Sequence, residues 1–255
     1  MNTTIIKQLK PRLVAQAAVV FAIAFAAKLF YSTSSVNDLR WILAPTTRVV
    51  ELITGEHFWF ESYAGYMNAD RSFLIADSCS GMNFLITAFL MLGVMKLRRG
   101  LTAKVSWSFI PAIMAVAYVT TIAANTVRIT VAMRLHRMSP EMIWINPDQL
   151  HRLEGIFIYF GFLLFLFTFA QDLDGVDRHT QKRGGLLRRS LIPLSLYWFV
   201  TLGIPILNGA YRNGAGFWEH TLFVLLTPTT LILPLAAIKR LLRGRKFTSG
   251  SFRYS

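Results

Sequence analysis

The sequence has few of the residues that cross-link or charge a soluble domain. Among 255 residues it holds a single cysteine, Cys79, and only 16% of the chain is charged. A lone thiol cannot form an intramolecular disulfide, and a disulfide oxidoreductase needs paired cysteines, so the sequence excludes both. Cys79 is therefore an inert buried thiol, one half of an intermolecular bridge, or a nucleophile.

Two common hydrolase signatures are also missing. The chain has no His-Glu-x-x-His pair for a zinc protease and no Gly-x-Ser-x-Gly turn for a serine hydrolase. We therefore expect no metal ion and no organic cofactor. Acidic residues are scarce as well, with 13 Asp and Glu against 27 Lys and Arg, which gives a net charge of +14.

Long apolar runs are what the chain does contain. Hydrophobic residues make up 54% of it, and the runs approach the roughly 20 residues that a helix needs to cross about 30 Å of hydrocarbon. We predict an all-α, polytopic helical membrane protein whose first span is a retained anchor. Six spans are expected, over about Leu13–Tyr31, Met82–Met95, Val105–Ala124, His151–Ala170, Leu191–Leu207 and Phe217–Ala237.

The basic residues predict the orientation of these spans. Most of them lie in one set of connections, within residues 7–12, 96–104, 178–189 and 239–253. Cytoplasmic loops are enriched in Lys and Arg, so this set and both chain termini are expected in the cytoplasm. Because these residues cluster beside apolar spans, anionic lipid headgroups explain the charge and no nucleic-acid partner is expected.

The longest outer connection has two parts. Leu39–Thr54 mixes apolar residues with Arg48 and reads as an amphipathic helix on the outer membrane surface, with Trp41 as an anchor at headgroup level. Gly55–Phe73 is polar and aromatic. It is either a loop that shapes a substrate groove or a solvated connector.

Cys79 begins the second predicted span on the outer side. Asp77 or Ser78 is a suitable N-cap, which would place the thiol at the positive end of a helix dipole. That position favours thiolate over thiol. Asn83, one turn further along, is a candidate supporting donor.

An arginine and a histidine are predicted at the same membrane face. Asn125 and Arg128 share a helix face near the outer end of the third span, where Arg128 is either functional or an interfacial anchor. The run Asn146–Asp148 supplies an N-cap and a first-turn proline for the fourth span, which puts His151 about one turn into that helix. The helix N-terminus disfavours imidazolium, so His151 is either a proton acceptor or simply a residue near a membrane helix end.

The blocks Asp77–Asn83, Asn125–Ile129 and His151–Gly155 together resemble the signatures of the exosortase/archaeosortase family, Cys-Ser-Gly, Asn-x-x-Arg and His-x-x-x-Gly, in the family's order. The resemblance covers roughly Leu39–Phe169. It implies a membrane-embedded cysteine transpeptidase of the bacterial inner membrane. Such enzymes process exported proteins that end in a sorting signal, consisting of a Pro-Glu-Pro type motif, a membrane helix and a basic tail.

On this interpretation Cys79 forms a thioester, His151 shuttles protons, and Arg128 stabilises negative charge or grips the acidic residue of the sorting motif. Asn83 and Asn125 would support them, all on the outer face. The alternative is a non-enzymatic transport or assembly factor for an exported polysaccharide. We expect one integral membrane domain with a catalytic core over about 39–170, two further spans over about 191–237 and a disordered tail over 246–255. The sequence predicts neither the acceptor nor the oligomeric state.

Overall fold

The structure is a computed structural model, and it describes residues 3–101, 103–137, 147–173, 186–207, 212, 217–219, 221–230, 232 and 234. The chain divides into two compact units, Met1–Phe167 and Thr168–Ser255. Every predicted site residue lies in the first unit. The expected tail over 246–255 falls outside the described residues.

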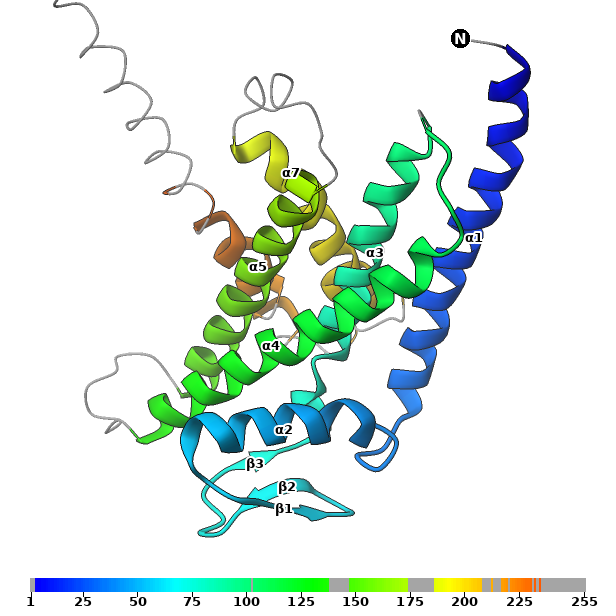
Figure 1. The fold of residues 1–255 in the computed structure, drawn as a ribbon. Coiled ribbons are helices and arrows are strands. Elements are labelled where there is room, and N and C mark those ends of the chain that lie inside the picture. The colour runs from blue at the N-terminus through cyan, green and yellow to red at the C-terminus, as the bar shows by residue number, and fades with distance from the viewer. Residues whose placement is uncertain are drawn as a thin grey trace, which may run out of the picture. The chain divides into compact units, whose positions relative to one another are not determined.

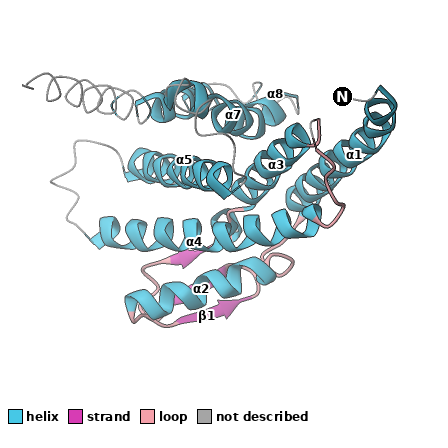
Figure 2. Ribbon diagram, turned by 45° about the horizontal axis from the view of Figure 1, so that its top comes forward, coloured by secondary structure: helices cyan, strands magenta, loops and turns pink. Residues whose placement is uncertain are grey.

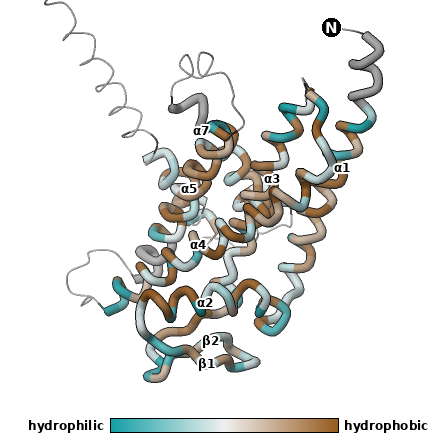
Figure 3. Tube along the Cα trace, viewed as in Figure 1, coloured by the Kyte–Doolittle hydropathy of each residue, from teal (hydrophilic) through white to brown (hydrophobic). Residues whose placement is uncertain are grey.

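Within the described residues, four helices are long and apolar enough to cross a membrane, and they match the first four predicted spans. They cover Pro11–Thr33, Asp77–Arg99, Phe109–Arg137 and Leu153–Leu173. In Figure 3 the hydrophobic colour runs along much of α1, α3 and α4, whereas the hydrophilic colour lies mainly at helix ends and in the connecting segments. The protein is therefore a mostly helical, polytopic membrane protein.

Helices α1 (Thr3–Thr33) and α3 (Met82–Arg99) pack side by side and antiparallel (Figure 1). Their register is set at glycines of the α3 segment. A Cβ atom at Gly93 would lie 2.7 Å from Val20 Cγ1, and one at Gly100 would lie 2.6 Å from Leu13 Cδ1. Because a larger residue at Gly93 would collide with the branched Val20, the contact fixes how far α1 slides along α3.

The predicted amphipathic helix is present as α2 (Arg40–Thr54), and it ends at Gly55 with φ 75°. Its buried face packs on α4 (Phe109–Arg137) and on the turn that carries Cys79. Trp41 stacks on Tyr118 of α4 with ring centroids 5.6 Å apart. The apolar face that the sequence assigned to the membrane surface is therefore covered largely by protein, although Leu52 stays exposed.

The segment predicted as a loop over Gly55–Phe73 forms a small antiparallel sheet instead. Its strands, in spatial order, are β1 (Phe58–Glu61), β2 (Gly65–Asn68) and β3 (Leu74–Ile75). The prediction of a loop was therefore wrong, and the predicted all-α class is corrected to a mostly helical protein with one small sheet. Figures 1 and 2 show the sheet beside α2 at one end of α4.

One glycine lets the sheet close. Gly65 has φ 127°, and a Cβ atom there would lie 2.3 Å from the carbonyl oxygen of Ile75. No L-residue with a side chain fits that backbone without displacing β3. Since β3 leads directly into the Cys79 turn, this close approach helps to hold the turn against the sheet.

The second unit contains α7 (Leu186–Trp198), a π-helical turn (Phe199–Gly203) and α8 (Ile204–Leu207). Residues 221–230 are helical as well, and the Trp198 indole N–H donates to the Val224 carbonyl at 3.0 Å. Ser190–Gly203 is an apolar helix shorter than a full span. The predicted fifth span, Leu191–Leu207, lies within the described residues and coincides with this shorter helix, so it is not among the helices long enough to cross a membrane. The predicted sixth span falls partly on residues outside the described ranges and remains a prediction.

Candidate active site

Cys79 lies in a single 3₁₀ turn, Asp77–Ser80, between β3 and α3. The turn is closed by the Cys79 N–H, which donates to the Ala76 carbonyl at 2.9 Å. Helix α3 starts only after Gly81, whose φ of 72° reverses the chain. The N-cap prediction was therefore wrong, because neither Asp77 nor Ser78 caps α3 and the thiol precedes the helix.

Asn125 of α4 connects this turn to Arg128. Its side-chain amide, Nδ2, donates to the Cys79 carbonyl, and its Oδ1 accepts a hydrogen bond from Arg128 Nε at 3.2 Å. Asn125 is fully buried. The predicted pairing of Asn125 and Arg128 on one helix face is confirmed, and the amide acts as a bridge between arginine and cysteine.

Arg128 is buried, with 7% of its surface exposed, so the interpretation as a headgroup anchor is wrong. Helix α4 continues to Arg137 and is 29 residues long. The guanidinium interacts electrostatically with the Cys79 side chain. Among the described residues its Nη2 has no hydrogen-bond partner. A buried cation with an unused donor beside a thiol is suited to bind an anionic or carbonyl oxygen.

The histidine block lies on α5, which spans Pro147–Leu173 and begins at the predicted proline. His151 belongs to the first turns of this helix, and its side chain lies outside what the structure describes. One turn later, Gly155 passes close to Arg128, since a Cβ atom there would lie 3.5 Å from Arg128 Cδ. Glu154 is buried beside it and interacts electrostatically with Arg128.

Tyr159 is a site residue that the sequence analysis missed. Its hydroxyl donates to Asn125 Oδ1 at 2.8 Å, and its ring centroid lies 5.4 Å from the Arg128 guanidinium carbon. Phe84 of α3 also stacks on the Tyr159 ring, with ring centroids 5.2 Å apart. Tyr159 follows His151 by about two helical turns, so helical periodicity could have placed both on one face.

Lys28 contacts the site from α1. Its Nζ donates to Asn83 Oδ1 at 2.7 Å, although the two residues are 55 positions apart. This bond satisfies an ammonium group in an apolar span, and it uses Asn83 Oδ1 as the acceptor. The role of the Asn83 amide as a donor that supports Cys79 stays a prediction.

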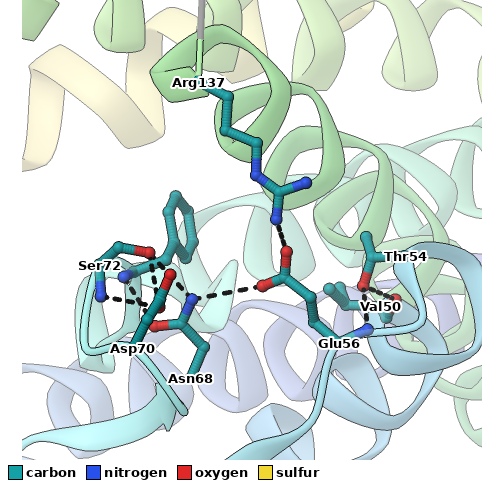
Figure 4. A network of polar contacts seen from close by, with 8 residues as sticks. Val50, Thr54, Glu56, Asn68, Asp70, Ser72 and Arg137 are labelled. Carbon is teal, nitrogen blue, oxygen red and sulfur yellow. Dashed lines mark hydrogen bonds and ion pairs between the residues drawn. The ribbon is translucent and has the colours of Figure 1, made fainter.

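A polar network joins the sheet to the end of α4 (Figure 4). Arg137 forms an ion pair with Glu56, and Glu56 also accepts a hydrogen bond from Asn68 Nδ2 at 3.3 Å. Ser72 donates its hydroxyl and its backbone N–H to Asp70, which holds the pKa of that carboxyl below its usual value. These contacts fix the loop before β3.

An open pocket of about 350 Å³ lies beside this loop, and it is lined by Glu56, His57, Trp59, Asn68, Ala69 and Asp70.

Three separate segments thus converge on one buried group, namely the Cys79 turn, the Asn125–Arg128 pair and the Gly155–Tyr159 stretch of α5. A model of the transmembrane exosortase family, of the EpsH type, matches residues 6–169. The chain belongs to the exosortase family. Comparison with curated proteins and with solved structures gives no match.

The family match covers the whole of this exosortase site, from α1 to most of α5. It also includes Lys28 and the three-stranded sheet, which lie outside the three sequence blocks. Within the described ranges, no group of three or more His, Cys, Asp and Glu side chains could hold a metal ion.

Proposed function

We propose that this exosortase is a cysteine transpeptidase that cuts the C-terminal sorting signal from membrane-anchored exported proteins and transfers them to an acceptor. The proposed substrates carry a Pro-Glu-Pro type motif, a membrane helix and a basic tail. The single observation that carries the proposal is the bridge formed by Asn125, whose amide bonds the Cys79 carbonyl on one side and the buried Arg128 on the other.

The chemistry requires a thiolate and a fixed positive donor. Arg128 stabilises the Cys79 thiolate as a nearby cation whose buried charge is poorly screened by solvent. The thiolate attacks the scissile carbonyl carbon and forms a C–S bond, while the carbonyl π electrons move to oxygen. Arg128 Nη2 is available to that oxyanion.

Collapse of the oxyanion restores the C=O bond and breaks the C–N bond, which leaves a thioester on Cys79. His151 takes the thiol proton of Cys79 as the thiolate forms, and it then gives this proton to the departing amine. The acceptor then loses a proton to His151 as it attacks the thioester and releases the Cys79 thiolate. No metal or organic cofactor takes part in these steps.

The length of α4 supports a site near the outer membrane boundary. At about 1.5 Å per residue its 29 residues extend roughly 44 Å, which exceeds the hydrocarbon thickness of about 30 Å. The stretch from Phe109 to Arg128 accounts for about that thickness. The turns beyond Arg128 then project into water, where Arg137 meets Glu56 of the sheet region.

The test is the covalent intermediate. A reporter protein ending in a Pro-Glu-Pro motif, an apolar helix and a basic tail is co-expressed with the full-length enzyme. Wild type should cleave it and yield a hydroxylamine-sensitive enzyme–reporter adduct. Cys79→Ala should abolish both, Cys79→Ser should be nearly inactive because a hydroxyl is a poor nucleophile, and His151→Ala should keep only traces of turnover.

Matched amounts of each variant in the membrane are the control. Processing of the reporter by Cys79→Ala at the wild-type rate would contradict the assignment of the nucleophile and restore the inert-thiol interpretation.

A further inference from the structure

Helix α1 presents a polar end to the active site that the proposed mechanism does not use. Gln16, Val20 and Ala24 are buried along one stripe of α1. Lys28 and Tyr31 continue the same stripe at helical spacing. Tyr31 is partly buried, so its ring lies in the protein while part of it remains accessible.

The register between α1 and α3 brings this end of the stripe to the Cys79 turn. Successive contacts pair Leu13 with Gly100, Val20 with Gly93, and Lys28 with Asn83. Because the helices are antiparallel, the next turn of α1 after Lys28 lies beside the residues just before Asn83. The turn Asp77–Ser80 comes directly before those residues, Gly81 and Met82.

The environment of Tyr31 agrees with this register. Its phenol interacts electrostatically with residues of the turn, among them Asp77 and Cys79, and with Arg128. Lys28 Nζ sits 5.5 Å from the Tyr31 ring centroid while it is bonded to Asn83, so the ring is held from α1 and α3 together.

The same place holds donors that lack acceptors. Arg128 Nη2 and the Ser80 hydroxyl are buried without a well-formed hydrogen bond among the described residues. Ser80 is fully buried and Arg128 is 7% exposed. Buried donors without partners are costly, and a ligand oxygen that accepts from them would remove the cost.

We propose that Tyr31 is a further catalytic residue, whose hydroxyl donates, together with Arg128, to the carbonyl oxygen that Cys79 attacks. The phenol keeps its proton throughout and contributes only a hydrogen bond, which strengthens as charge develops on that oxygen. This inference rests on the proposed function. It adds α1 to the elements that build the site.

The test compares Tyr31→Phe with Tyr118→Phe in the full-length enzyme, using the same reporter protein in lipid nanodiscs. Tyr118 also lies in a membrane helix, but its hydroxyl donates to the Trp41 carbonyl at 2.8 Å. Loss of one oxyanion donor predicts a fall in kcat of about 10- to 100-fold for Tyr31→Phe with KM changed less than about threefold. Tyr118→Phe should keep kcat near the wild-type value.

A second measurement separates catalysis from structure. The rate at which iodoacetamide alkylates Cys79, the single cysteine of the chain, should stay within about twofold of wild type in Tyr31→Phe, because alkylation creates no oxyanion. A kcat above half the wild-type value, or an equal loss of alkylation and kcat, would overturn the role of Tyr31. Wild-type processing that does not depend on Cys79 would instead overturn the proposed function.

Discussion

The side-chain amide of Asn125 donates a hydrogen bond to the backbone carbonyl of Cys79, across 46 positions of sequence. The orientation of this amide is determined by two donors on its other side. Arg128 Nε and the Tyr159 hydroxyl both point at Oδ1, so Nδ2 must face the Cys79 turn. One buried amide therefore couples the position of the nucleophile to that of the arginine.

Two replacements of Asn125 should distinguish its bond to the Cys79 carbonyl from its bonds to Arg128 and Tyr159. Asn125→Asp keeps an acceptor for Arg128 and Tyr159 but cannot donate to the Cys79 carbonyl, while Asn125→Leu loses both. We expect kcat to fall about 10-fold or more in the first and further in the second, since each leaves a buried polar group unpaired. Initial rates of reporter processing measure this.

The matched control is Asn37→Leu. Asn37 also donates from its side-chain amide to a backbone carbonyl, that of Ser62 at 3.1 Å, but it does so at the exposed surface. Its processing rate should remain near that of wild type. An Asn125→Leu enzyme as active as Asn37→Leu would show that the bridge has no role in catalysis.

Arg128→Lys should lose most activity while the protein remains in the membrane at normal levels. Lysine keeps the charge but not the forked, planar donor set that reaches Asn125 through Nε and leaves Nη2 free for an oxyanion. Arg40→Lys is the control, because Arg40 stacks on Phe60 at 4.2 Å outside the site. Processing by Arg128→Lys equal to that of Arg40→Lys would mean that Arg128 acts as a point charge.

Gly81→Ala should impair both stability and activity. The residue has φ 72°, and a Cβ atom there would lie 3.1 Å from Thr121 Cγ2 and 3.4 Å from Asn125 Cγ. An alanine at this φ is expected to lower the free energy of unfolding by about 1–2 kcal/mol through backbone strain. Displacement of Asn125 by the new Cβ atom adds a specific loss of activity. Thermal unfolding and reporter processing measure the two effects.

Substitutions at two other glycines serve as controls that distinguish backbone strain at Gly81 from its contact with Asn125. Gly55 has φ 75° with no atom within 4 Å of its Cβ position, so Gly55→Ala tests strain alone. Gly161 lies within α5 with the same open space and no unusual φ, so Gly161→Ala should be neutral or slightly stabilising. If Gly81→Ala loses no more activity than Gly55→Ala, the contact with Asn125 is unimportant.

The membrane orientation can be tested because Cys79→Ala leaves a chain without cysteine. In that background Tyr63→Cys, at a fully exposed position beside the sheet, should react with a membrane-impermeant maleimide in intact cells whose outer membrane has been made permeable. Leu101→Cys, exposed in the connection after α3, should react only after the inner membrane is lysed. The reverse pattern would put the Cys79 turn on the cytoplasmic side and contradict the mechanism.

The sequence by itself determined the elements whose signal is local. Apolar runs of about 20 residues fix the four long helices, because each can satisfy its backbone hydrogen bonds alone in a membrane. Pro147 fixed the start of α5, and the spacing of Asn125 and Arg128 fixed their shared face. The three short blocks identified the family because their order is carried by the sequence itself.

Features that depend on contacts between segments far apart in the sequence became visible only in the tertiary structure. The strands of the small sheet have four, four and two residues, too few for an alternating pattern to show, and they form only because they pair. The burial of Arg128 depends on the packing of neighbouring helices around it. The contacts of Lys28 with Asn83 and of Tyr159 with Asn125 depend on how separate helices slide and rotate against each other, which no local preference of the chain specifies.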